Sequence, residues 1–335
     1  MKKLILHVGP HKTGTTYIQK YLYLNRNVLI EYGWDYPEPI ELEPEVGHYG
    51  HIKLGIDESQ ISFYLSNSKS ERIIFSSENL YILEENKMDK LFKTITDAGF
   101  EKVIVVFYAR HPVKRFYSFI KELIKGGWHY TIPEFLCIYL IAPFKRASLN
   151  YTIFLNNIKR FNPDIVIIDY EYFSKNSLLT PLIEIMEIPI GSINLKKEVV
   201  NKGIKDEFAE ILRYLNLKCK AFGIDPQGYK MFNAVRKVLS SNDKLKEKIN
   251  ELQDVLSQYK KSITIGSFIP SALEHIFINN YSNSFYKGIH ESWSKEIEIS
   301  YITEEWMFNK NLLKIVDNLY KNCVKLLNDS SNITQ

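Results

Sequence analysis

Cysteine is scarce in this chain of 335 residues, which contains only Cys137, Cys219 and Cys323. The three are far apart and odd in number, which argues against a disulfide framework and favours a reducing compartment. None stands at the spacing of metal ligands, so we expect no metal site. Buried thiols are the simpler interpretation.

Long hydrophobic runs are also missing. No apolar stretch approaches the ~18 residues needed to cross a membrane. The apolar run after Lys2 and Lys3 is interrupted at His7 and Gly9, which is too early for a secretory signal. The sequence therefore predicts a cytoplasmic protein without a transmembrane segment, and it leaves peripheral association with a membrane open.

Neither sign of charge is in large excess. The 43 basic and 39 acidic residues give a formal net charge of +4, which is too small to indicate nucleic acid as a partner. Apolar residues make up 45% of the chain and charged residues 24%, as in ordinary globular proteins. The composition therefore does not indicate a function, which has to be inferred from local motifs.

The most informative stretch is residues 4–24, LILHVGPHKTGTTYIQKYLYL. The apolar run Leu4–Val8 predicts a buried strand, which Gly9–Gly14 cannot extend because Gly-Pro breaks the pattern. From Thr15 onward apolar residues recur at helical spacing. A strand, a glycine-bounded loop and a helix N-terminus deliver several backbone N–H groups to an anion.

The loop partly follows the Walker pattern G-x-x-x-x-G-K-[ST], through the spacing of Gly9 and Gly14 and through Thr16. However, Thr15 stands where that pattern has lysine, and the lysine lies inside the loop as Lys12. We therefore expect the loop to hold a phosphate-like group other than the triphosphate of ATP. The alternative is that the loop is an ordinary connection.

Three further apolar runs predict strands, and each leads into polar residues. They are Ile73–Ser76 before Ser77 and Glu78, Val103–Tyr108 before Ala109 and Arg110, and Ile165–Asp169, which Tyr170 and Glu171 continue. Such runs predict an α/β fold with a mostly parallel central sheet and helices on both faces. Helical spacing beyond Pro226 predicts a single domain over 1–335, with an α/β core at 1–204 and a helical C-terminal portion at 205–335.

Two of these strand ends carry candidate functional residues. Glu78 lies at the sheet edge where α/β proteins bind ligands, which makes it a candidate general base, although its charge could simply favour a helix N-terminus. Arg110 ends another strand, and Ser118 lies about two turns into the helix that follows. A guanidinium and a hydroxyl suit a phosphate, and the alternative is an exposed arginine with a solvated serine.

Candidate acceptor contacts lie in loops. They are His48 and His51 in a Pro- and Glu-rich stretch, and Trp128 just past a pair of glycines. Histidine can accept hydrogen bonds, and an aromatic face can stack on a sugar ring. The alternatives are surface polar groups and an aromatic residue packed on the core.

The segment 10–16, PHKTGTT, resembles the phosphosulfate loop of sulfotransferases that use 3′-phosphoadenosine 5′-phosphosulfate (PAPS), in which a lysine stands two residues before Gly-Thr-Thr. Arg110 and Ser118 resemble the pair with which that family binds the 3′-phosphate. Glu78 resembles the base glutamate that carbohydrate-type members carry after their second strand. The resemblance covers residues 4–175 well and the remainder weakly.

The resemblance implies a P-loop-type, three-layer fold and a bacterial, carbohydrate-type enzyme. Such an enzyme moves the sulfuryl group of PAPS to a hydroxyl or amine of a saccharide or glycolipid, and releases adenosine 3′,5′-bisphosphate (PAP) without a metal. It assigns catalysis to Lys12 and Glu78. It assigns nucleotide binding to His11, Lys12, Thr13, Gly14, Thr15, Thr16, Arg110 and Ser118. The alternatives are a small-molecule P-loop kinase using ATP and Mg²⁺, and a nucleotide-binding protein without catalysis.

Overall fold

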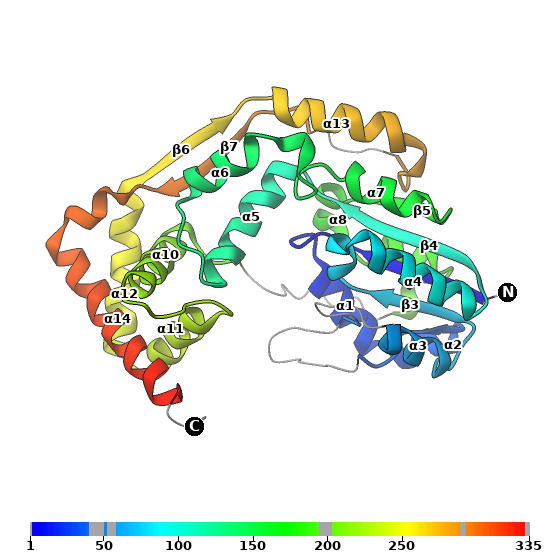
Figure 1. Ribbon diagram of the computed structural model, residues 1–335, viewed down its shortest axis with the longest axis horizontal. Coiled ribbons are helices and arrows are strands. Elements are labelled where there is room, and N and C mark those ends of the chain that lie inside the picture. Colours follow the sequence, from blue (N-terminus) through cyan, green and yellow to red (C-terminus); the bar gives the residue numbers. More distant parts are fainter. Residues whose placement is uncertain (1, 40–49, 52–57, 194–202, 289–292, 332–335) are drawn as a thin grey trace. The chain divides into compact units, whose positions relative to one another are not determined.

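The computed structural model (Figure 1) describes residues 2–39, 50–51, 58–193, 203–288 and 293–331. The chain forms two compact units, each assembled from three segments of sequence. The first unit comprises Met1–Arg115, Pro143–Asn201 and Ser267–Lys295. The second unit comprises Phe116–Ala142, Lys202–Gly266 and Glu296–Gln335.

This division differs from the predicted one at residues 204 and 205. Residues 116–142 group with the later part of the chain, and residues 267–295 group with the earlier part. The reason is that local apolar patterns locate helices and strands, but they do not say which distant segments pack together.

The first unit is built on a five-stranded parallel sheet with the order β2-β3-β1-β4-β5. The strands are β1 (Lys2–Val8), β2 (Trp34–Asp35), β3 (Arg72–Ser76), β4 (Phe100–Ala109) and β5 (Asp164–Asp169). In the central strand β1, His7 is paired with Ser76 of β3 and Val106 of β4. The carboxyl ends of these three strands are therefore neighbours, and the predicted α/β fold with a parallel sheet is confirmed.

Helices cover both faces of this sheet, because the strand side chains alternate between two hydrophobic clusters. Leu4 and Leu6 of β1 belong to the first cluster, and Ile5 belongs to the second. The first cluster includes side chains of α3 (Glu58–Ser66), α4 (Glu85–Asp97), α7 (Thr152–Lys159) and α13 (Phe268–Tyr281). The second includes side chains of α1 (Thr15–Leu24), α2 (Arg26–Glu31), α8 (Tyr170–Asn176) and α9 (Thr180–Ile185).

The prediction that Tyr170 and Glu171 continue β5 is wrong, because these two residues begin α8. Asp169 caps that helix, its carboxylate accepting a 3.3 Å hydrogen bond from the N–H of Tyr172. An aspartate at this position satisfies a first-turn N–H that has no partner within the helix, and this stabilises the change from strand to helix.

The second unit is mainly helical, and α5 (Pro112–Lys125) runs into it from the first unit. Its other helices are α6 (Ile132–Leu140), α10 (Asp206–Ala221), α11 (Lys230–Ser241), α12 (Asp243–Leu256) and α14 (Lys310–Ser331). It also has an antiparallel strand pair, β6 (Lys260–Ile265) with β7 (Ile297–Ile302), which the prediction of a helical portion misses. β7 does carry a strand signal, because Ile297 and Ile299 are buried in alternation with exposed or partly exposed residues.

Short 3₁₀ segments connect several of these elements. In the first unit they are η2 (Asn79–Ile82), η3 (Pro143–Lys145), η4 (Ile190–Ser192) and η6 (Ser282–Ser284), and in the second η5 (Ser257–Tyr259) and η7 (Glu304–Phe308). None of the helices in the described ranges combines the length and the apolar character needed to span a bilayer.

Candidate active site

The connection between β1 and α1 has the strand-loop-helix form that the sequence predicts. Gly14 precedes the first turn of α1 in the left-handed backbone conformation, with φ of 76°. Lys12 is also left-handed, with φ of 74°, which is costly for a residue that has a side chain. The first N–H groups of α1 lack intrahelical partners, so this helix end favours negative charge. The loop thus joins a strained lysine to a helix N-terminus.

The loop is packed so closely around Gly9 that a side chain there would force its neighbours to move. A Cβ added at Gly9 would lie 2.5 Å from Thr13 Oγ1 and 2.6 Å from Thr15 Cγ2. The hydroxyl of Thr13 donates a 2.8 Å hydrogen bond to the carbonyl of Pro10. Thr13 and Thr15 are buried, whereas Thr16 is partly exposed. Of the three threonines, Thr16 is therefore the one whose hydroxyl is most accessible to a ligand.

Arg110 follows β4 and reaches this loop. Its Nη1 donates a 2.8 Å hydrogen bond to the carbonyl of Lys12, and its guanidinium stands 5.0 Å from the centre of the Tyr170 ring. Its Nε lies 3.6 Å from a carboxylate oxygen of Glu171, and no hydrogen-bond acceptor for that buried Nε is found among the described residues. The side chain is 20% exposed. Arg110 therefore combines loop contacts with an accessible cationic edge.

Glu171 forms an ion pair with Arg110. It also accepts a 3.0 Å hydrogen bond from the backbone N–H of His111. Burial raises the pKa of Glu171, and the His111 N–H and the Arg110 charge oppose that rise. The sequence assigns no role to Glu171, although its place next to a strand end is the kind of signal that singles out Glu78 and Arg110.

Glu78 lies just after β3, where it meets the Gly9–Gly14 loop. One of its carboxylate oxygens contacts Nδ1 of His11, so the candidate base and a loop histidine form a pair. Their side chains are 22% and 38% exposed, respectively. The structure therefore brings His11, Lys12, Glu78 and Arg110 together at one edge of the sheet.

Arg115 contributes to the site in a way that the sequence pattern does not indicate. Helical periodicity places it on the polar side of α5, yet its side chain is buried. Its guanidinium donates to the hydroxyl of Tyr151 (3.1 Å), to the carbonyl of His11 (3.4 Å) and to the carbonyl of Ser148. The Tyr151 hydroxyl in turn donates to the carbonyl of Arg110 (2.5 Å). Arg115 and Tyr151 thus connect the backbones of the loop and of the β4 end.

His51 lies in the core rather than at the surface. Its Nδ1 accepts a 3.1 Å hydrogen bond from the N–H of Ser76, and its Nε2 lies 2.8 Å from the carbonyl of Pro37. Burial lowers the pKa of His51 to about 4. Both ring nitrogens thus have partners and the imidazole is neutral. The ring therefore offers no lone pair to a hydroxyl of an acceptor substrate. His48 lies outside the described residues.

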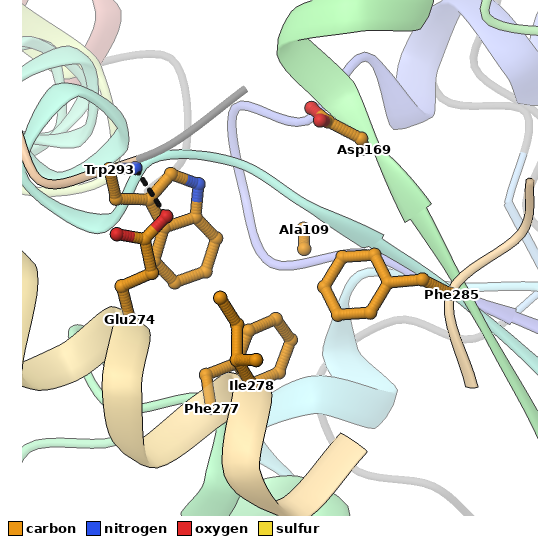
Figure 2. Close-up of a pocket in the computed structure, with 7 residues that line it drawn as sticks. All are labelled: Ala109, Asp169, Glu274, Phe277, Ile278, Phe285 and Trp293. Atoms are coloured by element: carbon orange, nitrogen blue, oxygen red, sulfur yellow. Dashed lines mark hydrogen bonds between the residues drawn. The ribbon is translucent and has the colours of Figure 1, made fainter. Parts of the chain in front are cut away.

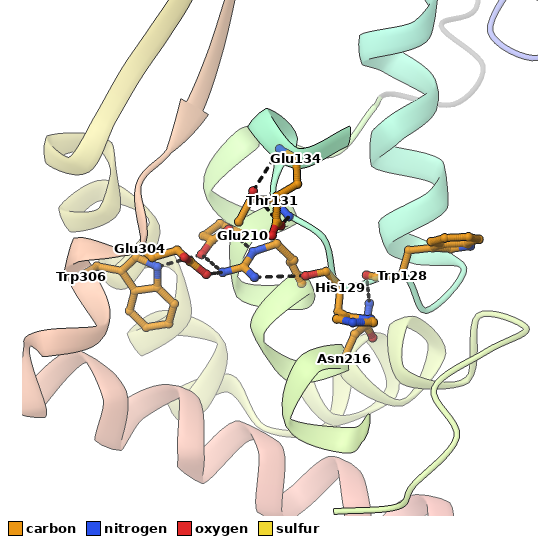
Figure 3. A network of polar contacts seen from close by, with 9 residues as sticks. Trp128, His129, Thr131, Glu134, Glu210, Asn216, Glu304 and Trp306 are labelled. Atoms are coloured by element: carbon orange, nitrogen blue, oxygen red, sulfur yellow. Dashed lines mark hydrogen bonds and ion pairs between the residues drawn. The ribbon is translucent and has the colours of Figure 1, made fainter. Parts of the chain in front are cut away.

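Ser118 and Trp128 belong to the second unit. Ser118 is partly exposed on α5, and its part in binding a 3′-phosphate stays a prediction. Trp128 is 41% exposed, and its ring points away from a network of polar contacts that holds the loop around it (Figure 3). The side-chain amide of Asn216 donates to the carbonyl of Trp128 at 2.9 Å.

The network behind Trp128 is built on a buried ion pair. Arg213 makes two contacts with Glu210, at 2.7 and 2.8 Å, and one with Glu304 at 2.8 Å. It also donates to the carbonyl of His129 at 3.1 Å. The indole N–H of Trp306 donates to Glu210 at 2.9 Å. These bonds rigidify the loop that presents Trp128, which is an arrangement suited to a fixed aromatic surface.

The first unit also encloses a cavity near the ends of β4 and β5 (Figure 2). Its volume is about 10 Å³, which is room for one water molecule at most. It is lined by Ala109, Asp169, Glu274, Phe277, Ile278, Phe285 and Trp293. Glu274 accepts a 2.6 Å hydrogen bond from the N–H of Trp293. A nucleotide or an acceptor cannot enter this cavity.

The described ranges contain no group of three or more histidine, cysteine, aspartate or glutamate side chains arranged to hold a metal ion. Comparison with known proteins finds no match to a family model, to a curated protein or to a solved structure.

Proposed function

We propose that this protein is a P-loop-type sulfotransferase that moves the sulfuryl group of PAPS to an acceptor. The observation that carries the proposal is the hydrogen bond from Arg110 to the carbonyl of Lys12. The resemblance assigns Arg110 to the 3′-phosphate of the nucleotide and the loop around Lys12 to its 5′-phosphosulfate. This hydrogen bond connects the two. Two anionic groups of one nucleotide would thus bind to neighbouring elements, because the Arg110 side chain is bonded to the backbone of the loop that carries Lys12.

The residues at this edge suit an anionic nucleotide. Arg110 offers an accessible planar guanidinium, which binds phosphate oxygens in pairs. Lys12 and the N-terminus of α1 add positive charge within the same loop. Lysine at position 12, in place of the usual Walker position, supports a group other than the triphosphate of ATP, which argues against the kinase alternative.

In sulfuryl transfer, as in phosphoryl transfer, the protein mainly aligns the reacting groups and stabilises the charge that develops. We assign Lys12 to the negative charge that develops on the oxygen departing with the 5′-phosphate. A base at the neighbouring strand end, where Glu78 lies, would remove the proton of the attacking group. The acceptor that we propose is a hydroxyl or amine of a saccharide or glycolipid, and the setting is the cytoplasm.

The test is a calorimetric titration of the full chain with PAP, AMP, and ATP with and without Mg²⁺. A 3′-phosphate bound by Arg110 should contribute roughly 1.5–3 kcal/mol, so PAP should bind about tenfold or more tightly than AMP. Equal affinities for PAP and AMP would contradict the proposal. Tight binding only of ATP with Mg²⁺ would favour a kinase, and PAP binding without conversion of PAPS to PAP would favour a binding protein.

A further inference from the structure

The contact between His11 and Glu78 joins two neighbouring strand ends. His11 follows β1, Glu78 follows β3, and the two strands are paired in parallel up to His7 and Ser76. A carboxylate can only accept a hydrogen bond, so the Nδ1 that it contacts must carry the imidazole proton. Nε2 of a neutral His11 then has the lone pair. This is the arrangement in which a histidine acts as a general base with a carboxylate as its orienting partner.

The other histidines around these strand ends cannot take that part. His7, His51 and His111 are buried. Burial lowers the pKa of His7 to about 3, and it lowers those of His51 and His111 to about 4, so all three stay neutral and enclosed at pH 7. Of the described histidines at this edge, His11 is the one that is both substantially exposed and paired with a carboxylate.

Hydrogen bonds hold the backbones of both His11 and Glu78 in place. An ordinary ion pair on a protein surface does not need such support. The carbonyl of His11 accepts a hydrogen bond from Arg115, whose side chain is buried. The carbonyl of Glu78 accepts a 3.2 Å hydrogen bond from the N–H of Tyr81, in the 3₁₀ segment η2. The pair is therefore held next to Lys12, the residue that follows His11 in the loop.

We infer that His11 is the general base of the proposed transfer, and that Glu78 is a positioning residue that holds the His11 imidazole in its Nδ1–H form. This inference rests on the proposed function, and it changes the role that the resemblance gives to Glu78. His11 becomes the catalytic residue, because Nδ1 is the ring nitrogen that contacts Glu78 and the inference assigns Nε2 to the proton of the acceptor.

The step balances without any further reactant. The O–H bond of the acceptor breaks as its proton moves to Nε2 of His11, and the acceptor oxygen forms the new bond to sulfur. The old bond between sulfur and the bridging oxygen breaks, and its electron pair stays on the 5′-phosphate of PAP. Nothing is oxidised or reduced. Glu78 stabilises the imidazolium until His11 returns the proton to water.

The first test reads the His11 tautomer by nitrogen NMR of the ¹⁵N-histidine-labelled full chain, with His11→Gln used to assign the signal. At pH 8 the wild type should show protonated Nδ1 and unprotonated Nε2. Glu78→Ala should shift the proton to Nε2, whereas Glu78→Gln, whose amide oxygen can still accept, should largely preserve the wild-type tautomer. A wild-type His11 protonated on Nε2, or a tautomer unchanged in Glu78→Ala, would overturn the pairing.

The second test measures release of PAP from PAPS with water as the acceptor. His11→Gln should lower the rate at saturating PAPS by roughly 10²–10⁴, and Glu78→Gln should lower it less. His275→Gln, which removes an exposed histidine bonded to Asn279, is the control and should match the wild type. Full activity in His11→Gln, with Glu78→Gln inactive, would return the base to Glu78.

The two tests separate this inference from the proposed function. If PAP fails to bind and the wild type does not consume PAPS, the proposed function and the catalytic role fall together, whatever the tautomer. If PAP binds and PAPS is consumed but the tautomer test fails, the dyad alone is overturned.

Discussion

Arg110 and Lys12 are joined by a hydrogen bond of 2.8 Å from Nη1 of the arginine to the carbonyl oxygen of the lysine. The bond connects the end of β4 to the loop after β1, at a residue whose backbone is left-handed. Arg110 therefore has two separable tasks. It fixes the loop through a directed bond, and under the proposed function it would also supply positive charge to the nucleotide.

Arg110→Lys keeps the charge and removes the planar fork, so it tests the directed bond. We expect PAP affinity to fall about tenfold or more, because lysine cannot bond the loop carbonyl and two phosphate oxygens together. Calorimetry measures the change. Arg160→Lys is the matched control, since Arg160 pairs with Glu85 and Asp89 on the surface and should leave PAP affinity unchanged. Unchanged affinity in Arg110→Lys would show that charge alone suffices.

Gly9→Ala tests whether the loop conformation depends on close packing. The added Cβ would lie 2.5 Å from Thr13 Oγ1, so either the threonine side chains or the loop backbone must shift, and we expect nucleotide binding to be weakened. Gly191→Ala is the control, because a Cβ there meets nothing within 4 Å and needs no left-handed backbone. Comparison of PAP binding and thermal unfolding midpoints for the two variants decides the point. Equal behaviour of both would contradict the packing argument.

The strands of the first unit were largely predictable because parallel strands buried on both faces are continuous apolar runs. The predicted Ile73–Ser76 differs from β3 (Arg72–Ser76) by one residue. β2, with only the two residues Trp34–Asp35, carries too short a pattern to be recognised. In the second unit, β6 was missed because most of its residues are exposed and polar, so no apolar run marks it.

The sequence indicates which strand ends carry the residues of the candidate site, but not how their side chains pair. Residues that follow parallel strands meet at one edge, which explains why the sequence indicates Lys12, Glu78 and Arg110. The pairing of His11 with Glu78 depends on the order of β3 beside β1, and strand order is a long-range property that local periodicity does not contain. For the same reason the burial of Arg115 against Tyr151 was not foreseen.

The burial of His51 should make the free energy of unfolding depend on pH. Its pKa is about 4 when folded, against about 6.5 for a free histidine, so the unfolded chain binds more protons between these values. The contribution of His51 is full above about pH 6.5, and it is lost as the pH falls toward about 4, by up to about 3 kcal/mol. His51→Asn keeps an acceptor for the Ser76 N–H and does not titrate in this range. Urea unfolding at pH 7 and 4.5 should therefore show the wild type losing more stability than the variant. Equal losses would contradict the assignment.

Asp206, in the second unit, should also lose its stabilising effect as the pH falls, but in a more acidic range than His51. It borders a surface pocket of about 400 Å³ and is bonded by Lys121 (2.5 Å), Lys260 (2.9 Å), Tyr117 (2.6 Å) and Ser300 (2.8 Å). Burial alone would raise its pKa, but the bonds from Lys121 and Tyr117 outweigh burial, and the pKa lies well below the ordinary value.

A carboxyl whose folded pKa is lowered stabilises the fold above its unfolded pKa of about 4, and it loses that effect as the pH falls further. Asp206→Asn should therefore cost roughly 2 kcal/mol at pH 7, and less at pH 3. Urea unfolding at both pH values measures this. Asp254→Asn, at the border of the same pocket, is the control. A cost independent of pH would show that the charge of Asp206 does not matter.

Two substitutions of Lys12 should separate the effect of its backbone strain on stability from the effect of its charge on binding. Its left-handed backbone, with φ of 74°, is strained for any residue with a Cβ, whereas glycine adopts it freely. Lys12→Gly should therefore be more stable than Lys12→Ala by roughly 0.5–1 kcal/mol, because the alanine retains the strain.

Both variants lose the ammonium, so both should bind PAP more weakly and turn over PAPS more slowly than the wild type. Thermal unfolding ranks the stabilities, and calorimetry with PAP ranks the affinities. If Lys12→Gly bound PAP as well as the wild type, the lysine would serve only the shape of the loop. Weaker PAP binding in both variants, with Lys12→Gly the more stable of the two, would instead show that the ammonium of Lys12 binds the ligand while its backbone is strained.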